Sequence, residues 1–279
     1  MRFPSLVLAL FALLLAGCSE QATLGGRPAP KVWTSAVSLS PSLTEIASLH
    51  TKLRLAGRTS ACNYPPNVVS LPVMMNGVKP DYEAIQKAGA SVVLYDKQLF
   101  SDADLEPLKS AGVDTFGLTA NTLDGFVDEL YQLGALTASE SKMSEYVDLI
   151  HAAVGVAKAA VGDRKPKVAI LLGGEGGEHM ICGVKSFQAD ILKTIGAVPV
   201  GPDADNFVPV NAEWLVSQNP DVIITASHPD VFMADKRLSS IKAIKTGMVR
   251  GLLPDLVLRK GARVERLIRR FSDAITGAK

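Results

Sequence analysis

A long helical pattern between two stretches of alternating strand and helix patterns constrains the fold of this chain more than any other feature. In residues 139–161 the apolar positions recur at spacings of three and four, which predicts one amphipathic helix. At about 1.5 Å per residue such a helix is roughly 33 Å long, about the width of a small domain. Its apolar stripe comprises Met143, Val147, Ile150, Val154 and Ala157. We therefore expect this helix to join two globular parts.

On both sides of the long helix, short strand patterns alternate with helical patterns. The strands before it are expected at residues 36–39, 91–95 and 113–118, and the helices from Ser40 onward and at 81–88, 102–111 and 123–133. The strands after it are expected at 167–172 and 221–225, and the helices at 186–195, 212–218 and 263–275. This alternation predicts parallel βαβ units, and therefore an α/β fold with two lobes. A ligand would lie in the cleft between them.

The first residues predict export and a lipid anchor. Arg2 precedes an apolar run from Leu6 to Leu15, which is too short to span a bilayer but suits a signal peptide. The segment Leu15-Ala16-Gly17-Cys18 resembles a bacterial lipobox, which implies cleavage before Cys18 and acylation of its thiol and its new amino group. Several acyl chains on one residue anchor a protein stably. Ser19 leaves the choice between the inner and the outer membrane open.

These patterns divide the chain into five expected parts. The parts are a signal peptide at 1–17, the lipidated Cys18 with a flexible tether at 18–31, an N-terminal lobe at 32–137, the interlobe helix at 138–162 and a C-terminal lobe at 163–279. The tether is expected because glycines and prolines are frequent in this segment.

Composition excludes several classes of function. The net charge is +1, from 29 basic and 28 acidic residues, which argues against a nucleic-acid partner. Histidines are few, and no Gly-x-Ser-x-Gly elbow or zincin motif is present, so we expect neither an enzyme nor a cofactor. Cys62 and Cys182 could pair or stay free. Glu178, His179 and Cys182 are spaced like metal ligands, but no second motif completes a closed site.

Six short motifs in a fixed order resemble those of the cobalamin- and iron-chelate-binding proteins of ABC importers, with the cobalamin-binding branch nearest. They are VSLSPSLTEI at 37–46, NYPP at 63–66, DYEAI and ASVVL between 81 and 94, GVKSFQAD at 183–190, NAEWLV and NPDVII between 211 and 224, and PD and RKGAR between 254 and 263. The last motif resembles the family pattern R-P-G-P-R. Each motif alone is weak, whereas six in order are specific.

The resemblance implies a fold of two Rossmann-like lobes with parallel sheets, joined by a single long rigid helix. It also implies a monomeric solute-binding protein, periplasmic or at the cell surface, that delivers cobalamin or a related corrinoid to a membrane permease. Haem or a ferric siderophore is the alternative ligand, because the same fold serves them. A metal-ion binder, a ligand-sensing lipoprotein and an enzyme are less favoured.

The resemblance also implies roles for individual residues. Glu83 and Glu213, one in each lobe, match the glutamates that meet arginines of the transmembrane subunits, where bidentate contacts fix the register. Aromatic rings that contact the corrin in cobalamin binders correspond to Ala61 and Met75, and neither is aromatic here. Tyr64 and His179 are the candidate axial ligands for haem. The expected ligand-binding residues are Cys62, Asn63, Tyr64, Met74, Met75, Asn76, Gly77, Gly174, Glu175, His179, Phe207, His228 and Asp255.

Overall fold

The computed structural model describes residues 31–76, 78–173 and 179–278, and residues 32–279 form one compact unit. The expected signal peptide, the lipidated Cys18 and its tether up to residue 30 lie outside the described residues, as do Gly77, Gly174 and Glu175. In the described part of the chain, no helix is both long enough and apolar enough to cross a membrane.

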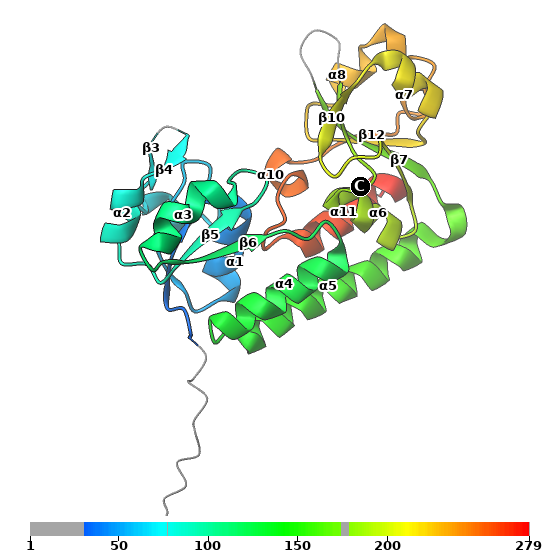
Figure 1. Ribbon diagram of the computed structural model, residues 1–279. Helices are drawn as coiled ribbons and strands as arrows, with labels where there is room; N and C mark the ends of the chain where they lie inside the picture. The colour runs from blue at the N-terminus through cyan, green and yellow to red at the C-terminus, as the bar shows by residue number, and fades with distance from the viewer. Residues whose placement is uncertain (1–30, 77, 174–178, 279) are drawn as a thin grey trace, which may run out of the picture. The chain divides into compact units, whose positions relative to one another are not determined.

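The first sheet is parallel, as the alternation of strands and helices predicts. Its strands lie in the order β2 (Arg54–Arg58), β1 (Ser35–Ser38), β5 (Val92–Asp96) and β6 (Asp114–Leu118) (Figure 1). The helices that alternate with these strands are α1 (Pro41–His50), α2 (Tyr82–Lys87), α3 (Asp102–Ser110) and α4 (Leu123–Leu136). A small hairpin of β3 (Met75–Asn76) and β4 (Lys79–Pro80) precedes α2.

The long helix is present as α5 (Glu140–Val161), with 22 residues. Its buried side chains are Met143, Tyr146, Val147, Ile150, Ala153, Ala157 and Val161. Met143, Val147, Ile150 and Ala157 of this list belong to the expected apolar stripe. The fifth expected residue, Val154, is half-buried. The helix packs against α4 and against α11 (Val264–Thr276), the last helix of the chain.

The second sheet contains the expected parallel pairs and, in addition, antiparallel pairs that were not expected. Its strands lie in the order β10 (Phe207–Val210), β8 (His179–Cys182), β7 (Lys167–Gly173), β11 (Val222–Thr225) and β12 (Val249–Gly251), with β9 (Val198–Val200) beside β7. Strands β8 and β10 run antiparallel to their neighbours. The connection from β7 to β8 is too short for a crossover, so it can join only antiparallel strands. The overall α/β class with two sheets and one long helix is confirmed.

The helices of the second half are short apart from α11. They are α6 (Phe187–Thr194), α7 (Ala212–Gln218), α8 (Asp230–Met233), α9 (Lys242–Lys245) and α10 (Pro254–Val257). Helix α11 is strongly amphipathic, and its buried face includes Leu267, Ile268 and Phe271. Helices that expose one polar face gain most of their stability from such packing.

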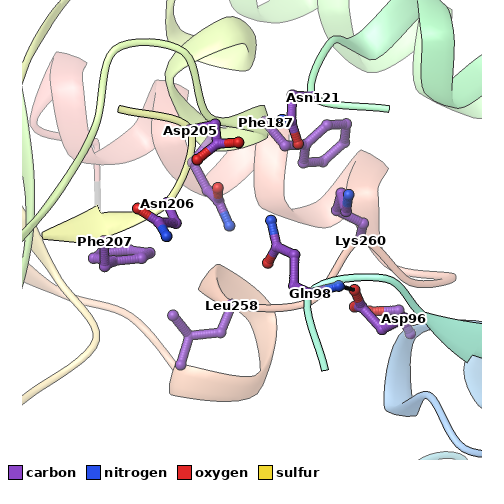
Figure 2. A pocket seen from close by; sticks show the side chains of 11 residues that line it. Asp96, Gln98, Asn121, Phe187, Asp205, Asn206, Phe207, Leu258 and Lys260 are labelled. Atoms are coloured by element: carbon purple, nitrogen blue, oxygen red, sulfur yellow. Dashed lines mark hydrogen bonds between the residues drawn. The ribbon is translucent and has the colours of Figure 1, made fainter. Parts of the chain in front are cut away.

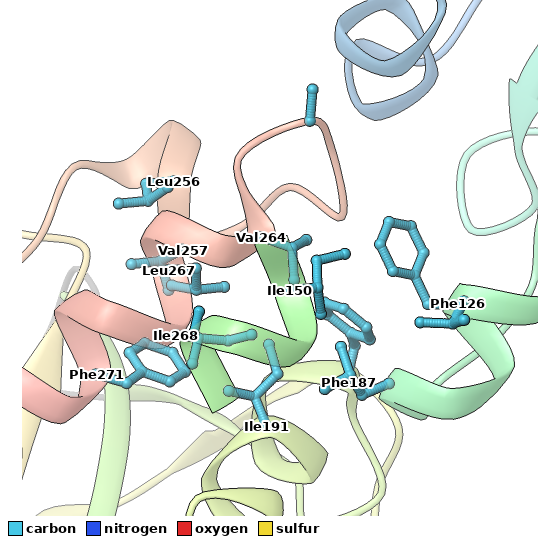
Figure 3. Packing of buried hydrophobic residues seen from close by; sticks show 14 of the residues in the cluster. Phe126, Ile150, Phe187, Ile191, Leu256, Val257, Val264, Leu267, Ile268 and Phe271 are labelled. Carbon is cyan, nitrogen blue, oxygen red and sulfur yellow. The ribbon is translucent and has the colours of Figure 1, made fainter. Parts of the chain in front are cut away.

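One continuous apolar core joins the two sheets. It contains residues of β1 and α1, continues through α4, α5 and α11, and reaches β7 and β11. Figure 3 shows side chains from α4, α5, α6 and α11 meeting in this cluster. The rings of Phe126 and Phe187 meet edge to face with centroids 5.3 Å apart. Because this core is continuous from one sheet to the other, side chains of α5 and α11 take part in the packing of both sheets.

A buried tyrosine fixes the start of α11 on α5. The hydroxyl of Tyr146 donates to the carbonyl of Gly261 at 2.6 Å and accepts from the backbone N–H of Val264 at 3.1 Å. Tyr146 is 1% exposed, so water cannot replace either bond if the hydroxyl is removed. Unpaired buried backbone groups are costly.

We therefore expect Tyr146→Phe to lower the free energy of unfolding by about 2 kcal/mol, because two buried backbone groups lose their partner. Urea denaturation measures the effect. Tyr131→Phe is the matched control, since Tyr131 is 44% exposed. Equal stability of the two variants would contradict this role of the hydroxyl.

Candidate functional site

The main candidate site is a pocket of about 210 Å³ lined by residues of both halves of the chain (Figure 2). The first half contributes residues from the start of α1, from the end of β5 and from the loop before α4. The second half contributes residues of α6, of the segment that enters β10, and of the segment between α10 and α11. The lining residues are Ser42, Asp96, Gln98, Asn121, Phe187, Gln188, Asp205, Asn206, Phe207, Leu258 and Lys260.

Carboxamides dominate the polar lining of this pocket. Gln98, Asn121, Gln188 and Asn206 each offer both a donor and an acceptor. Gln188 is fixed, because it is 8% exposed and its Nε2 donates to the carbonyl of Val257 at 2.8 Å. The apolar surface comes from two rings, Phe187 and Phe207, and from Leu258. The pocket can thus hold an apolar face and hydrogen-bond groups at its edge.

Three charged residues line the pocket. Asp96 is the last residue of strand β5, Asp205 is exposed, and Lys260 is buried. The ammonium of Lys260 donates to the carbonyl of Ala120 at 2.9 Å and lies 6.0 Å from the ring centroid of Phe187. Burial lowers the pKa of Lys260, while the carboxylates of Asp96 and Glu129 oppose that shift. The lining as described contains no His, Cys, Met, Tyr or Arg.

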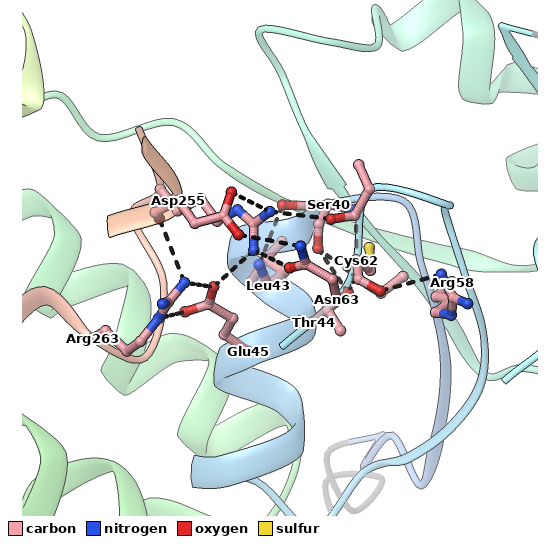
Figure 4. Close-up of polar contacts among 12 residues, drawn as sticks. Ser40, Leu43, Thr44, Glu45, Arg58, Cys62, Asn63, Asp255 and Arg263 are labelled. Atoms are coloured by element: carbon pink, nitrogen blue, oxygen red, sulfur yellow. Dashed lines mark hydrogen bonds and ion pairs between the residues drawn. The ribbon is translucent and has the colours of Figure 1, made fainter. Parts of the chain in front are cut away.

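A buried ionic cluster joins α1 to the segment before α11 (Figure 4). Glu45 is 1% exposed and accepts from Arg263 Nε at 3.0 Å, from Arg263 Nη2 at 2.5 Å and from Arg259 Nη1 at 3.2 Å. Arg259 also donates to Asn63 Oδ1 at 2.8 Å and pairs with Asp255 Oδ1 at 2.9 Å. Bidentate guanidinium–carboxylate contacts are geometrically specific. The cluster therefore fixes the register of the two segments.

Gly261 allows this close approach. A Cβ atom at Gly261 would lie 2.5 Å from Glu45 Oε2, so a larger residue would displace the carboxylate. The glycine of the RKGAR motif is thus explained by the ionic cluster.

The structure brings some expected ligand residues together and separates others. Phe207 lies in the pocket lining. Asn63 and Asp255 lie in the ionic cluster and bond to each other at 3.2 Å, and the Arg263 guanidinium lies 4.3 Å from the ring centroid of Tyr64. These three residues therefore contact the arginines rather than line the pocket.

The remaining expected ligand residues lie elsewhere in the described chain. Cys62 and Met74 are buried, with Met74 in an apolar cluster of the first half and Met75 packed beside it. Asn76 ends β3. His179 is buried, and its ring centroid lies 5.3 Å from that of Phe232. The side chain of His228, in contrast, is 75% exposed and lies beside Asp230.

Both cysteines of the folded part are free thiols. Cys62 Sγ accepts from the Thr44 hydroxyl at 3.0 Å, and Cys182 Sγ lies 2.8 Å from Ser186 Oγ. Burial raises the pKa of Cys182 to about 11, despite the hydrogen bond to Ser186. Across the described ranges, no group of three or more His, Cys, Asp or Glu residues is arranged to hold a metal ion.

Sequence reasoning missed most of the pocket lining. Asp96 was detectable, since it stands at the carboxyl end of a predicted strand, where α/β proteins bind ligands. Lys260 was detectable as a lysine where the family pattern has proline. Asn121, Asp205 and Asn206 lie in connections without a periodic pattern, so no local signal pointed to them.

The two expected docking glutamates have equivalent local positions. Glu83 is the second residue of α2, whose N-cap Asp81 accepts from the Ala84 N–H at 3.0 Å. Glu213 is the second residue of α7, whose N-cap Asn211 accepts from the Trp214 N–H at 2.9 Å. Both glutamates are exposed. A carboxylate in the first turn of a helix is also favourable by itself.

Comparisons with known proteins agree with this architecture. A family model described as periplasmic binding protein matches residues 37–256. The uncharacterized ABC transporter substrate-binding lipoprotein YvrC of Bacillus subtilis is 27% identical over 252 residues, covering 86% of this chain and 79% of that protein. The high-affinity heme uptake system protein IsdE of Staphylococcus aureus is 24% identical over 231 residues, covering 80% and 76%.

Among solved structures, the periplasmic vitamin B12 binding protein BtuF of Vibrio cholerae has the same fold. The TM-score is 0.75 at 17% identity, and the match covers 90% of this chain and 100% of that chain.

Removal of the Glu45 carboxylate should be strongly destabilising, because it leaves Arg259 and Arg263 without their shared buried partner. We expect Glu45→Ala to cost about 3–5 kcal/mol in urea denaturation. Glu106→Ala is the control, since Glu106 is exposed on α3. A loss below about 1 kcal/mol, as for surface pairs, would refute a structural role for the cluster.

The two buried thiols should be protected from a thiol reagent in the folded protein. With Cys18→Ser in the full chain, we expect Ellman's reagent to label neither Cys62 nor Cys182 at neutral pH, and both in concentrated guanidinium chloride. Two unreactive cysteines in denaturant without reductant would instead demonstrate a disulfide.

Proposed function

Because this chain belongs to the periplasmic binding protein family, we propose that it is an extracytoplasmic lipoprotein that binds cobalamin, or a related corrinoid, and delivers it to the transmembrane subunits of an ABC importer. Its family and its relatives consist of solute-binding proteins, so the chain is a binding protein and not an enzyme. YvrC is described as an ABC transporter substrate-binding lipoprotein, which supports both the ABC importer and the lipid anchor, for which Cys18 is the proposed site.

The chemistry of the pocket favours a corrinoid over haem. Similarity alone does not separate these ligands, because the relatives include a heme uptake protein and a vitamin B12 binding protein. The periphery of cobalamin carries primary carboxamides, and four carboxamides line the pocket beside two aromatic rings. Amides pair with amides through one donor and one acceptor on each. This match is the observation that carries the proposal.

Haem makes different demands on a site. Its iron takes an axial His, Cys, Met or Tyr, and none of these is among the described lining residues. Its propionates carry negative charge, and they would meet the carboxylates of Asp96 and Asp205 with only Lys260 to balance them. Cobalamin in its cyano form has no net charge and avoids this repulsion.

The pocket holds only part of such a ligand. Its volume of about 210 Å³ is smaller than sites for drug-sized ligands, which span roughly 300–1,000 Å³. The proposed pose therefore places one edge of the corrin in the pocket, with Phe207 against its face, and the rest in the cleft outside. A modest opening and closing of the lobes around the long helix would admit and hold the ligand.

Delivery depends on the two exposed glutamates in this proposal. Glu83 and Glu213 occupy the same position in helices of the two halves, and both carboxylates are accessible to arginines of a partner. Two separated, geometrically specific ion pairs would fix the orientation of the loaded protein on the importer.

Calorimetric titration of the purified full chain in detergent tests the ligand. We expect saturable one-to-one binding of cyanocobalamin and no specific binding of haemin, because only the former matches the amide lining. Phe207→Ala should weaken cobalamin binding by about tenfold through the loss of ring contact. Saturable haemin binding without cobalamin binding would reverse the choice of ligand.

Uptake assays test the docking glutamates separately from the ligand. With Glu83→Ala and Glu213→Ala together, we expect cobalamin uptake to fall at least tenfold while affinity in calorimetry stays unchanged. The matched control is Glu106→Ala with Glu140→Ala, two other exposed glutamates that lie on α3 and at the start of α5. Undiminished uptake by the Glu83 and Glu213 double variant would reject this docking surface.

A further inference from the structure

Lys260 is a buried cation in a pocket that is otherwise rich in amides. The residue is 7% exposed, lies in the segment between α10 and α11, and lines the pocket. It occupies the second position of the RKGAR motif, where the family pattern R-P-G-P-R has proline. A proline offers no side-chain donor, so the lysine adds an ammonium group that this family pattern lacks. Lysines are rarely buried without a partner.

The hydrogen bonds of Lys260 leave capacity for a ligand. An ammonium has three N–H donors. Within the described ranges, one hydrogen bond of this ammonium is found, to the carbonyl of Ala120 at 2.9 Å. Figure 2 shows Lys260 and Asp96 on the same side of the pocket, with Gln98 next to Asp96. The free donors of Lys260 are therefore available to an oxygen atom in the pocket.

The positive charge of Lys260 is already more than compensated by nearby carboxylates. The carboxylates of Asp96 and Glu129 both interact with its ammonium. Glu129 is held by the Thr119 N–H at 2.7 Å, the Thr119 hydroxyl at 2.6 Å and the Ala120 N–H at 3.0 Å, so it cannot turn away. Asp205 adds a third carboxylate at the exposed rim. A further negative group from a ligand would meet more negative than positive charge, whereas a neutral oxygen would not.

Asp96 supplies the complementary acceptor. Its Oδ1 accepts from the backbone N–H of Gln98 at 3.0 Å, which orients the carboxylate. Among the described residues, Oδ2 of Asp96 forms no hydrogen bond. An ionised carboxylate only accepts, and an ammonium only donates. Together they match a group that carries one acceptor and one donor side by side.

We infer that Lys260 and Asp96 form a subsite for a primary carboxamide of the ligand, with Lys260 donating to the carbonyl oxygen and Asp96 accepting from the NH₂ group. The inference rests on the proposed corrinoid-binding function and adds a specificity to it. The subsite accepts corrinoids whose side chains are amides and rejects those whose side chains are carboxylic acids. A carboxylate there has no donor for Asp96 and repels it.

The test compares two corrinoids that differ in side-chain chemistry. Calorimetry of the full chain in detergent uses dicyanocobinamide, which carries side-chain amides, and dicyanocobyrinic acid, which carries carboxylates. We expect the wild type to bind the amide at least about tenfold more tightly. Asp96→Asn should reduce this ratio about tenfold, because an asparagine both donates and accepts and carries no charge.

Two further variants complete the test: one is a control for the loss of a carboxylate, and the other removes the ammonium group of Lys260. Asp203→Asn removes a carboxylate that is exposed, pairs with Lys185 and lies outside the pocket lining, so the ratio should stay at the wild-type value. Lys260→Met keeps the length and the buried volume and should weaken binding of the amide about tenfold. Thermal unfolding of each variant verifies that the protein is folded.

The possible results separate the subsite from the ligand class. Equal affinity of the wild type for both corrinoids, or an unchanged ratio in Asp96→Asn, would overturn the carboxamide subsite while leaving the corrinoid ligand in place. Binding of neither corrinoid by the wild type would overturn the proposed ligand and this inference with it.

Discussion

The packing of α11 on α5 is the contact on which the rest of the structure depends. The apolar face of α11, including Leu267, Ile268 and Phe271, closes a core that reaches both sheets. Tyr146 of α5 then fixes the backbone just before α11 through two buried hydrogen bonds. Because that backbone is fixed, Arg259 and Arg263 meet Glu45, and Lys260 enters the pocket. A core contact thus positions both the ionic cluster and the candidate pocket.

The two arginines and the lysine of residues 259–263 lie in different environments. Arg259 and Arg263 face Glu45, whose carboxylate geometry suits their planar guanidinium groups. Lys260, one residue after Arg259, points instead toward Ala120 and the Phe187 ring. The segment therefore contributes to the ionic cluster on one side and to the lining of the candidate pocket on the other. Asn63 and Asp255, which the family resemblance placed among the ligand residues, contact Arg259 and each other on the cluster side of this segment.

Local signals predicted the regular elements well. Helix α7 and the long helix α5 lie within one residue of their expected bounds, because apolar periodicity and capping residues are encoded locally. The short strands β8, β9 and β10 were not expected. Three or four residues carry too little periodicity to be recognised, and the antiparallel pairing of β8 follows from its short connection to β7.

The sequence by itself determined the α/β class, the long helix, the family resemblance and the equivalent helix-start positions of Glu83 and Glu213. Only the tertiary structure decided which side chains share a pocket. Asp96, Asn121, Gln188, Asn206 and Lys260 come from separate segments, and no local pattern records that they meet. It also decided that Glu45, which the sequence presents as a residue of a helix start, is a buried partner of two arginines. The physical reason is that periodicity depends on neighbours in sequence, whereas burial and charge pairing depend on neighbours in space.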